Sequence, residues 1–198
     1  MKLFLFSVIV IMCMTIVGCT NQATNNPPQI APMSLSAPQQ EIVDLISRTG
    51  QEILLFEYSG TFTSMEVWVD VYHYGELVGT FAKLHKFGNS TESLTDGQLA
   101  IVIHNHNRDE FTWTMTSGGA SVSSQTWVAS NDHMARGFGP ITEAVPIISG
   151  EEIILYVSRF TTGSALNTHG DLQYYLQNPE ILAHYTYVHL IKARFSTN

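Results

Sequence analysis

The chain has 198 residues, with 17 acidic against 9 basic side chains and a formal net charge of −8 when histidine is counted as neutral. Hydrophobic residues make up 44% of the chain and charged residues only 13%. This balance excludes a wholly disordered chain, a polybasic nucleic-acid binder and a coiled coil. The length predicts one folded domain.

The N-terminal segment predicts export. Lys2 precedes an apolar run from Leu3 to Val17, which suits the hydrophobic region of a signal peptide and falls short of the roughly 20 residues that span a bilayer. The run ends Ile16-Val17-Gly18-Cys19, which resembles the lipobox of bacterial lipoproteins. The resemblance implies a signal peptide over residues 1–18, cleavage before Cys19 and acylation of its thiol. A plain secretory peptide or an uncleaved anchor is the alternative.

The same resemblance predicts the location and the partners. We expect a lipid-anchored protein on the extracytoplasmic face of the cell membrane, since acyl chains alone can hold a protein on a bilayer. Cys13 would leave with the signal peptide and Cys19 would carry lipid, so the mature chain would have no free thiol and no disulfide. Without Lys2 the charge becomes 8 − 17 = −9, which argues against adhesion to anionic headgroups. Beyond the membrane, we expect an unidentified protein or envelope ligand, and no nucleic acid.

The residues that follow Cys19 predict a tether. Residues 20–40 are rich in Asn, Gln, Ser, Ala and Pro and carry no charge, a composition typical of linkers. We therefore expect the lipidated cysteine and its tether over residues 19–40 and a folded domain over residues 41–198. Ile30, Met33 and Leu35 could pack on the domain, which leaves the boundary near Glu41 open by several residues.

From Glu41 onward the hydrophobic period is mostly two, which indicates β-strands. A short helix is expected first, around Ile42 to Ile46, and a second short helix after Asp171, ended by Pro179. The expected strands are 53–58, 65–72, 78–84, 98–105, 110–116, 121–129, 152–160 and 185–195. They predict an all-β fold, an antiparallel β-sandwich of about eight strands, immunoglobulin-like or jelly-roll, with one or two short helices.

One group of residues suggests a metal site. His104 and His106 are two residues apart on a predicted strand and therefore face the same way, and Glu110 follows on the return strand. This spacing resembles part of the first cupin motif, and the resemblance implies a metal bound by His104, His106 and Glu110. A second cupin motif is missing downstream, because Pro146 to Gly150 contains no histidine. The alternative is a polar hairpin loop with two exposed histidines.

Aromatic residues suggest a binding surface. Trp68, Tyr72 and Tyr74 lie on the side of their strand opposite to Val67 and Val69, so they form an amphipathic outer face that a ligand or partner protein could contact. The insertion helix or the tether could equally cover this face.

Catalytic motifs are absent from the sequence. There is no Gly-x-Ser-x-Gly elbow and no phosphate-binding glycine loop. The adjacent carboxylates of Glu151 and Glu152 would point to opposite faces of a strand. His189, which shares a face with Tyr187 and Ile191, is expected to be a partly buried imidazole with its hydrogen bonds satisfied. We therefore predict a binding module without enzymatic activity and without a cofactor.

Overall fold

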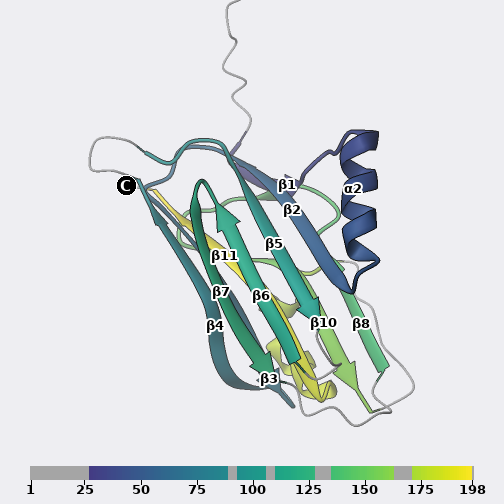
Figure 1. Cartoon of the computed structure of the whole chain (residues 1–198). Coiled ribbons are helices and arrows are strands. Elements are labelled where there is room, and N and C mark those ends of the chain that lie inside the picture. The colour runs from purple at the N-terminus through teal and green to yellow at the C-terminus, as the bar shows by residue number, and fades with distance from the viewer. Residues whose placement is uncertain (1–26, 89–92, 106–109, 128–134, 163–170, 198) are drawn as a thin grey trace, which may run out of the picture.

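The computed structural model describes residues 27–88, 93–105, 110–127, 135–162 and 171–197. Two antiparallel β-sheets pack face to face over one hydrophobic core (Figure 1). The predicted all-β class and the antiparallel sandwich are thereby confirmed.

The first sheet has six strands in the order β7-β6-β5-β2-β1-β9. The strands β2, β5, β6 and β7 match predicted strands, because their alternating residues mark one buried face. The bounds of the six strands are β1 Gln29–Pro32, β2 Gln51–Ser59, β5 Gly97–Asn105, β6 Glu110–Ser117, β7 Ala120–Trp127 and β9 Val145–Pro146.

The second sheet has five strands in the order β4-β3-β11-β10-β8. The predicted long hairpin is β3 and β4, and its turn places Tyr74 and Gly75 at φ values of 48° and 84°. A side chain at Gly75 would also meet the backbone nitrogen of Ala183 at 3.0 Å, so this turn needs glycine. The bounds of the five strands are β3 Ser64–His73, β4 Glu76–Phe87, β8 Ala135–Pro140, β10 Glu152–Thr161 and β11 Tyr187–Ser196.

The structure corrects the predicted boundary between tether and domain. Residues 29–40 were predicted to belong to the tether, with the domain starting at Glu41, but they include β1 and the start of α2. β1 pairs with both β2 and β9, and Ile30 is fully buried opposite Tyr58 and Val145. The folded domain therefore begins at Gln29. The error has a physical cause: a single buried isoleucine within a Pro-rich segment produces no alternation, and only pairing with distant strands makes this segment a strand.

β8 and β9 were also missed. β8 reads Ala-Arg-Gly-Phe-Gly-Pro and contains one residue of high β-propensity, Phe138. β9 has only two residues. Both lie at the edge of a sheet, where glycine and proline are tolerated because one side of the strand is not paired.

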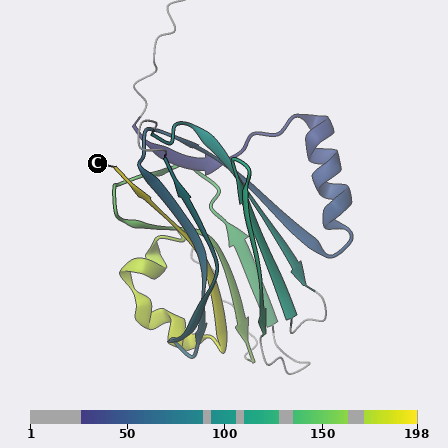
Figure 2. The same cartoon turned by 60° about the vertical axis from the view of Figure 1, so that its left-hand side comes forward.

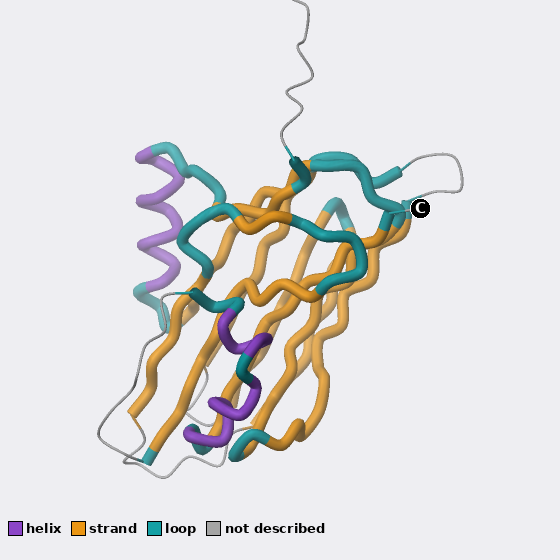
Figure 3. Tube along the Cα trace, turned by 180° about the vertical axis from the view of Figure 1, so that it is seen from behind, coloured by secondary structure: helices purple, strands orange, loops and turns teal. Residues whose placement is uncertain are grey.

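Short helices lie on two sides of the sandwich. The predicted first helix is α2 Ala37–Ser47; it starts after Ser36, whose backbone N–H donates to the Gln39 side chain, and it lies beside β2 (Figure 2). The predicted insertion helix is split into α3 Tyr174–Gln177 and the 3₁₀-helix η1 Pro179–His184. Figure 3 shows these two short helices in front of the strands when the molecule is seen from behind. No helix of the described ranges is long and apolar enough to span a bilayer.

The core lies between the two sheets. Met65, Val67 and Val69 of β3 face inward, as the period of two predicts, and they are fully buried together with Phe56 and Trp113 of the other sheet. Large aromatic side chains fill the end of the core near the β3–β4 turn, where Phe111, Trp113 and Phe160 surround His189.

Candidate functional site

A cluster of polar side chains projects into the sandwich from four strands at the end remote from Gln29. Glu52 enters from the first residues of β2, on the same face as Leu54 and Phe56. The hydroxyl of Tyr156 donates to a carboxylate oxygen of Glu52 at 2.8 Å, which joins the two sheets across the interior. Burial raises the pKa of Glu52 above its ordinary value, against the lowering effects of the Tyr156 hydrogen bond and the Arg136 charge.

Arg136 of β8 supplies the positive charge of this cluster. Its Nε donates to the Ser158 hydroxyl at 3.3 Å, and its Nη2 lies 3.9 Å from a Glu52 oxygen. The guanidinium also lies over the rings of Phe111, Phe138 and Phe160, at 5.1, 4.9 and 5.6 Å from their centroids. Stacking on three rings fixes the position of this cation before any ligand arrives.

These groups line a cleft between the sheets, which we call the β2–β8 cleft. Its volume is about 280 Å³, and its lining residues are Ser47, Gly50, Gln51, Glu52, Ile103, Asn105, Arg136 and Phe138. Among the described residues, the buried Oδ1 of Asn105 has no hydrogen-bond partner. An unpaired buried acceptor destabilises a fold by about 1–3 kcal/mol, and this one lies enclosed in the wall of the cleft.

His189 lies behind the cleft and is fully buried, so the expectation of a partly buried, satisfied imidazole is wrong. Within the described part of the chain, neither ring nitrogen has a hydrogen-bond partner. Burial, and secondly the charge of Arg136, lower the pKa of His189 to about 3. The imidazole is therefore neutral at physiological pH and acts as one more ring in the aromatic core.

Two larger hollows, each of about 650 Å³, lie elsewhere on the surface. One is lined by residues 141–146 and 171–173, and the other by residues around β1 and the start of β5. Their lining includes no lysine or arginine among the described residues. Asp171 and Asp96 already accept backbone hydrogen bonds, from Gln173 and Gly60. Neither hollow brings opposite charges together as the β2–β8 cleft does.

The outer face of the five-stranded sheet carries a separate charge network. The Lys192 ammonium lies 2.9 Å from Asp70 and 3.1 Å from Glu152. Although burial alone would lower it, the hydrogen bond and charge of Asp70 raise the pKa of Lys192 above its ordinary value. Because Asp70 and Lys192 are almost wholly buried and paired with each other, this pair does not offer a free charge to a ligand.

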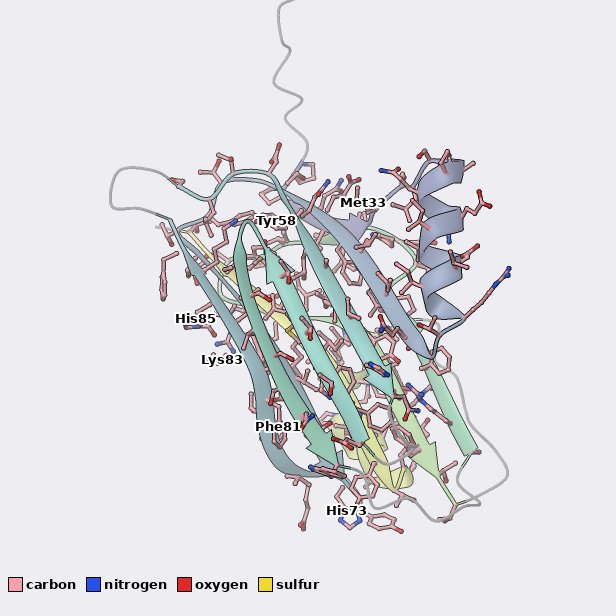
Figure 4. All side chains as sticks on the ribbon, in the orientation of Figure 1. Met33, Tyr58, His73, Phe81, Lys83 and His85 are labelled. Carbon is pink, nitrogen blue, oxygen red and sulfur yellow. The ribbon has the colours of Figure 1, made fainter. Side chains whose placement is uncertain are left out.

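The network continues to the edge strand β4. Glu66 is 3.9 Å from Arg194 and 3.5 Å from Lys83, and it forms an ion pair with His85. Lys83 and His85 are labelled on β4 in Figure 4. Burial opposes the effect, but the hydrogen bond and charge of His85, with those of Lys83, hold the pKa of Glu66 below its ordinary value. Glu66, like Asp70 and Lys192, thus has an opposite charge beside it.

The predicted aromatic surface does not form as expected. Trp68 and Tyr72 lie on the outer face, but Trp68 is only 6% exposed and Tyr72 is partly buried. The Arg194 guanidinium lies 5.2 Å from the Trp68 ring, and the Lys192 ammonium 5.8 Å from the Tyr72 ring. Tyr74 alone is exposed, at the turn. The rings are covered because the partner strand β11 supplies long cationic side chains on the same face.

The proposed metal ligands lie near one another only in part. The register pairs His104 with Thr112, so His104 and Glu110 share the outer face of the six-stranded sheet, one diagonal step apart. His106 lies outside the described residues. Within the described ranges, no three His, Cys, Asp or Glu side chains converge as metal ligands. Cys19, the predicted lipidation site, also lies outside the described residues.

The residues of the β2–β8 cleft were missed by the sequence analysis, although one signal was present. Glu52 lies on the same face of its strand as three apolar residues, Leu54, Phe56 and Tyr58. A carboxylate on a buried face is rarely found without a partner, so this position indicates an interior polar contact. Arg136 could not be found in this way, because its strand shows no alternation.

The comparisons with known proteins identify a family. The sequence model of the YgaN domain matches residues 29–195, which is nearly the whole folded region and begins at the first residue of β1. Neither a curated protein nor a solved structure matches the chain. The chain belongs to the YgaN domain family.

Proposed function

We propose that this protein is a lipid-anchored binding protein of the extracytoplasmic face of the cell membrane, acylated at Cys19. The proposal rests on the apolar run from Leu3 to Val17 and on the Ile16-Val17-Gly18-Cys19 sequence that follows it. A thioether-linked diacylglycerol, or three acyl chains, is sufficient to hold a domain on a bilayer without a membrane-spanning helix.

The observation that carries the proposal is the Ile16-Val17-Gly18-Cys19 sequence, and the polarity of the domain determines how an anchored domain would be oriented. β1 begins at Gln29, which pairs with Ser59 at the last residue of β2, whereas Glu52 and the β2–β8 cleft lie at the start of β2. At about 3.4 Å per residue, these two ends are roughly 25 Å apart. Figure 4 shows the same polarity, with Tyr58 near the end where the chain enters and His73 at the other end.

The short connection to Cys19 gives this polarity a functional consequence. Cys19 and Gln29 are 29 − 19 = 10 residues apart, and a flexible coil of that length spans roughly 17 Å. An acyl group on Cys19 would therefore hold the β1 end of the sandwich near the bilayer. The β2–β8 cleft would then open away from the membrane, where it can meet a ligand in the surrounding medium.

The contacts of the interior favour binding over catalysis. Ser158 lies beside His189 across two paired strands, but its hydroxyl accepts a hydrogen bond from Arg136. In the described part of the chain, neither nitrogen of His189 contacts a hydroxyl that it could activate, and nucleophilic catalysis requires such a contact. Glu52 and Arg136 are instead held in place by neighbours, as groups that recognise a ligand are.

Metabolic labelling with an alkyne fatty acid tests the anchor. In a bacterial host, we expect label on the wild-type protein and on the Cys13→Ala variant, whose cysteine would leave with the signal peptide. We expect no label on Cys19→Ala, which should also be released from the membrane or remain unprocessed. Undiminished label on Cys19→Ala, or its loss in Cys13→Ala alone, would overturn the assignment.

A further inference from the structure

The β2–β8 cleft holds two opposite charges that are close but do not saturate each other. The 3.9 Å separation of Arg136 Nη2 and the Glu52 oxygen is too long for a hydrogen bond, although the two groups attract by charge. The Nε of Arg136 donates to the Ser158 hydroxyl at 3.3 Å, and the guanidinium also lies within reach of the Tyr156 hydroxyl. The side chains of Arg136 and Glu52 are 25% and 24% exposed, so a molecule in the cleft can reach both.

A third polar group of the cleft lacks a partner. The Oδ1 atom of Asn105 is buried and accepts no hydrogen bond from a described residue, and Asn105 lines the same cleft as Arg136 and Glu52. This atom lies enclosed in the wall, so the groups that the cleft offers to a ligand are the N–H donors of Arg136 and the carboxylate acceptor of Glu52. Ile103 and Phe138, which is 54% exposed, add apolar surface to the wall, and Ser47, Gly50 and Gln51 complete it.

This combination selects for ligand charge. A simple anion would pair with Arg136 but would be repelled by Glu52. A simple cation would pair with Glu52 but would be repelled by Arg136. A molecule that carries both a carboxylate and an ammonium group satisfies the two residues at once. The volume of about 280 Å³ lies below the 300–1,000 Å³ of sites for drug-sized ligands, which restricts the ligand to a small molecule.

We propose that the β2–β8 cleft binds a free α-amino acid as a zwitterion. The ligand carboxylate accepts from the guanidinium of Arg136, and the ligand ammonium donates to the Glu52 carboxylate. The ligand side chain lies against Ile103 and Phe138. This inference deepens the proposed binding function and depends on it, since it names the ligand class for the end of the domain that opens away from the bilayer.

The charged groups of the cleft are preorganised for such a ligand. Ser158 and the three stacked phenylalanine rings fix the Arg136 guanidinium, and the hydroxyl of Tyr156 fixes the Glu52 carboxylate. Binding therefore does not have to order these side chains, which would otherwise reduce the affinity. A carboxylate on a guanidinium also gains the strength of a charge-assisted hydrogen bond.

Isothermal titration of the full chain in detergent tests the inference with defined probes. The probes are glycine, L-alanine, L-leucine and L-glutamate, each compared with the N-acetyl derivative, which lacks the cation, and with the methyl ester, which lacks the α-carboxylate. We expect saturable binding of at least one free amino acid and at least a tenfold weaker affinity for both of its derivatives. Equal affinity for either derivative, or no heat with any of the four amino acids, would overturn the zwitterion site.

Variants locate the site on the chain. Arg136→Gln and the isosteric Glu52→Gln should each weaken the affinity at least tenfold while circular dichroism shows a folded domain. Arg194→Gln, which removes the same charge from the outer face, serves as the matched control and should bind as the wild type does. A folded Glu52→Gln protein with unchanged affinity would refute the site. If no amino acid binds while Cys19 is still labelled by the fatty acid, the amino-acid site is refuted and the lipid anchor stands. If an amino acid binds but Cys19 is not labelled, the lipid anchor is refuted and the amino-acid site stands.

Discussion

The acid sensitivity of the fold provides a quantitative test of the interior, through the substitution His189→Leu. The imidazole of His189 is fully buried and contacts the rings of Phe111, Trp113 and Phe160. Burial, and secondly the charge of Arg136, lower its pKa to about 3. In the unfolded chain the pKa of a histidine is about 6.5. Below pH 6.5 the unfolded chain therefore binds a proton that the folded domain does not bind.

The sign of the effect follows from this difference. The free energy of unfolding of the wild type falls as the pH falls from 6.5 toward 3, by about 1.4 kcal/mol per pH unit from this group. Between pH 7 and pH 5 the loss is about 2 kcal/mol. Leucine does not titrate, so the stability of His189→Leu relative to the wild type should rise by about 2 kcal/mol over the same interval. At pH 7 the variant should be as stable as the wild type or slightly more so, because two unpaired buried nitrogens are removed.

Urea unfolding followed by far-ultraviolet circular dichroism at pH 7 and pH 5 measures this difference. The comparison with the wild type cancels the titration of the carboxyl groups, including Glu52 and Glu66. His184→Gln is the matched control, because His184 lies exposed in η1 and its loss should leave the pH dependence of the wild type in place. A stability difference between His189→Leu and wild type that stays constant within about 0.5 kcal/mol would refute the account of a sealed, unpaired imidazole.

Three further predictions test other parts of the structure. Lys192→Met should lower the free energy of unfolding by about 3–5 kcal/mol because it leaves the buried Asp70 carboxylate without its cation. Lys83→Met, at a 54% exposed side chain, should change it by less than about 1 kcal/mol, and equal effects in urea unfolding would be inconsistent with a buried network. Ile30→Ala should destabilise the domain by about 2–5 kcal/mol and the exposed Ile42→Ala by less than about 0.5 kcal/mol, a contrast that thermal melts would not show if residue 30 belonged to a tether. Elemental analysis of the purified protein should find no stoichiometric metal, and metal that is bound one to one and lost in His104→Ala would restore the cupin-like site.

The fold was largely predictable because most of its strands have one buried face. In β3, the inward-facing Val67 and Val69 alternate with the outward-facing Glu66 and Trp68. This alternation is visible in the sequence whichever strand lies beside β3, so the strand can be predicted without knowing its neighbours. β1 and β8 could not be predicted in this way. Ile30 has no neighbouring apolar residue at the period of two, and Arg136 stands in a Gly-rich segment, so both strands depend on pairing with partners that are distant in the chain.

The candidate site was much less predictable, because it depends on the strand order. Glu52, Arg136 and Tyr156 are far apart in the chain and meet only because β8 and β10 lie in one sheet opposite β2. The same limit applies to the outer face. Sequence parity places Trp68 there, but only the pairing of β3 with β11 brings Arg194 over its ring. Local patterns determine which face a side chain takes, and long-range pairing determines what it contacts.

Mass spectrometry of the protein extracted from bacterial membranes tests the central claim, a sandwich anchored by its β1 end, most directly. The account predicts an N-terminal peptide that begins at Cys19 and carries the mass of a diacylglyceryl group, with or without a further acyl chain. A chain that is intact from Met1, or a mature N-terminus with an unmodified Cys19, would contradict it.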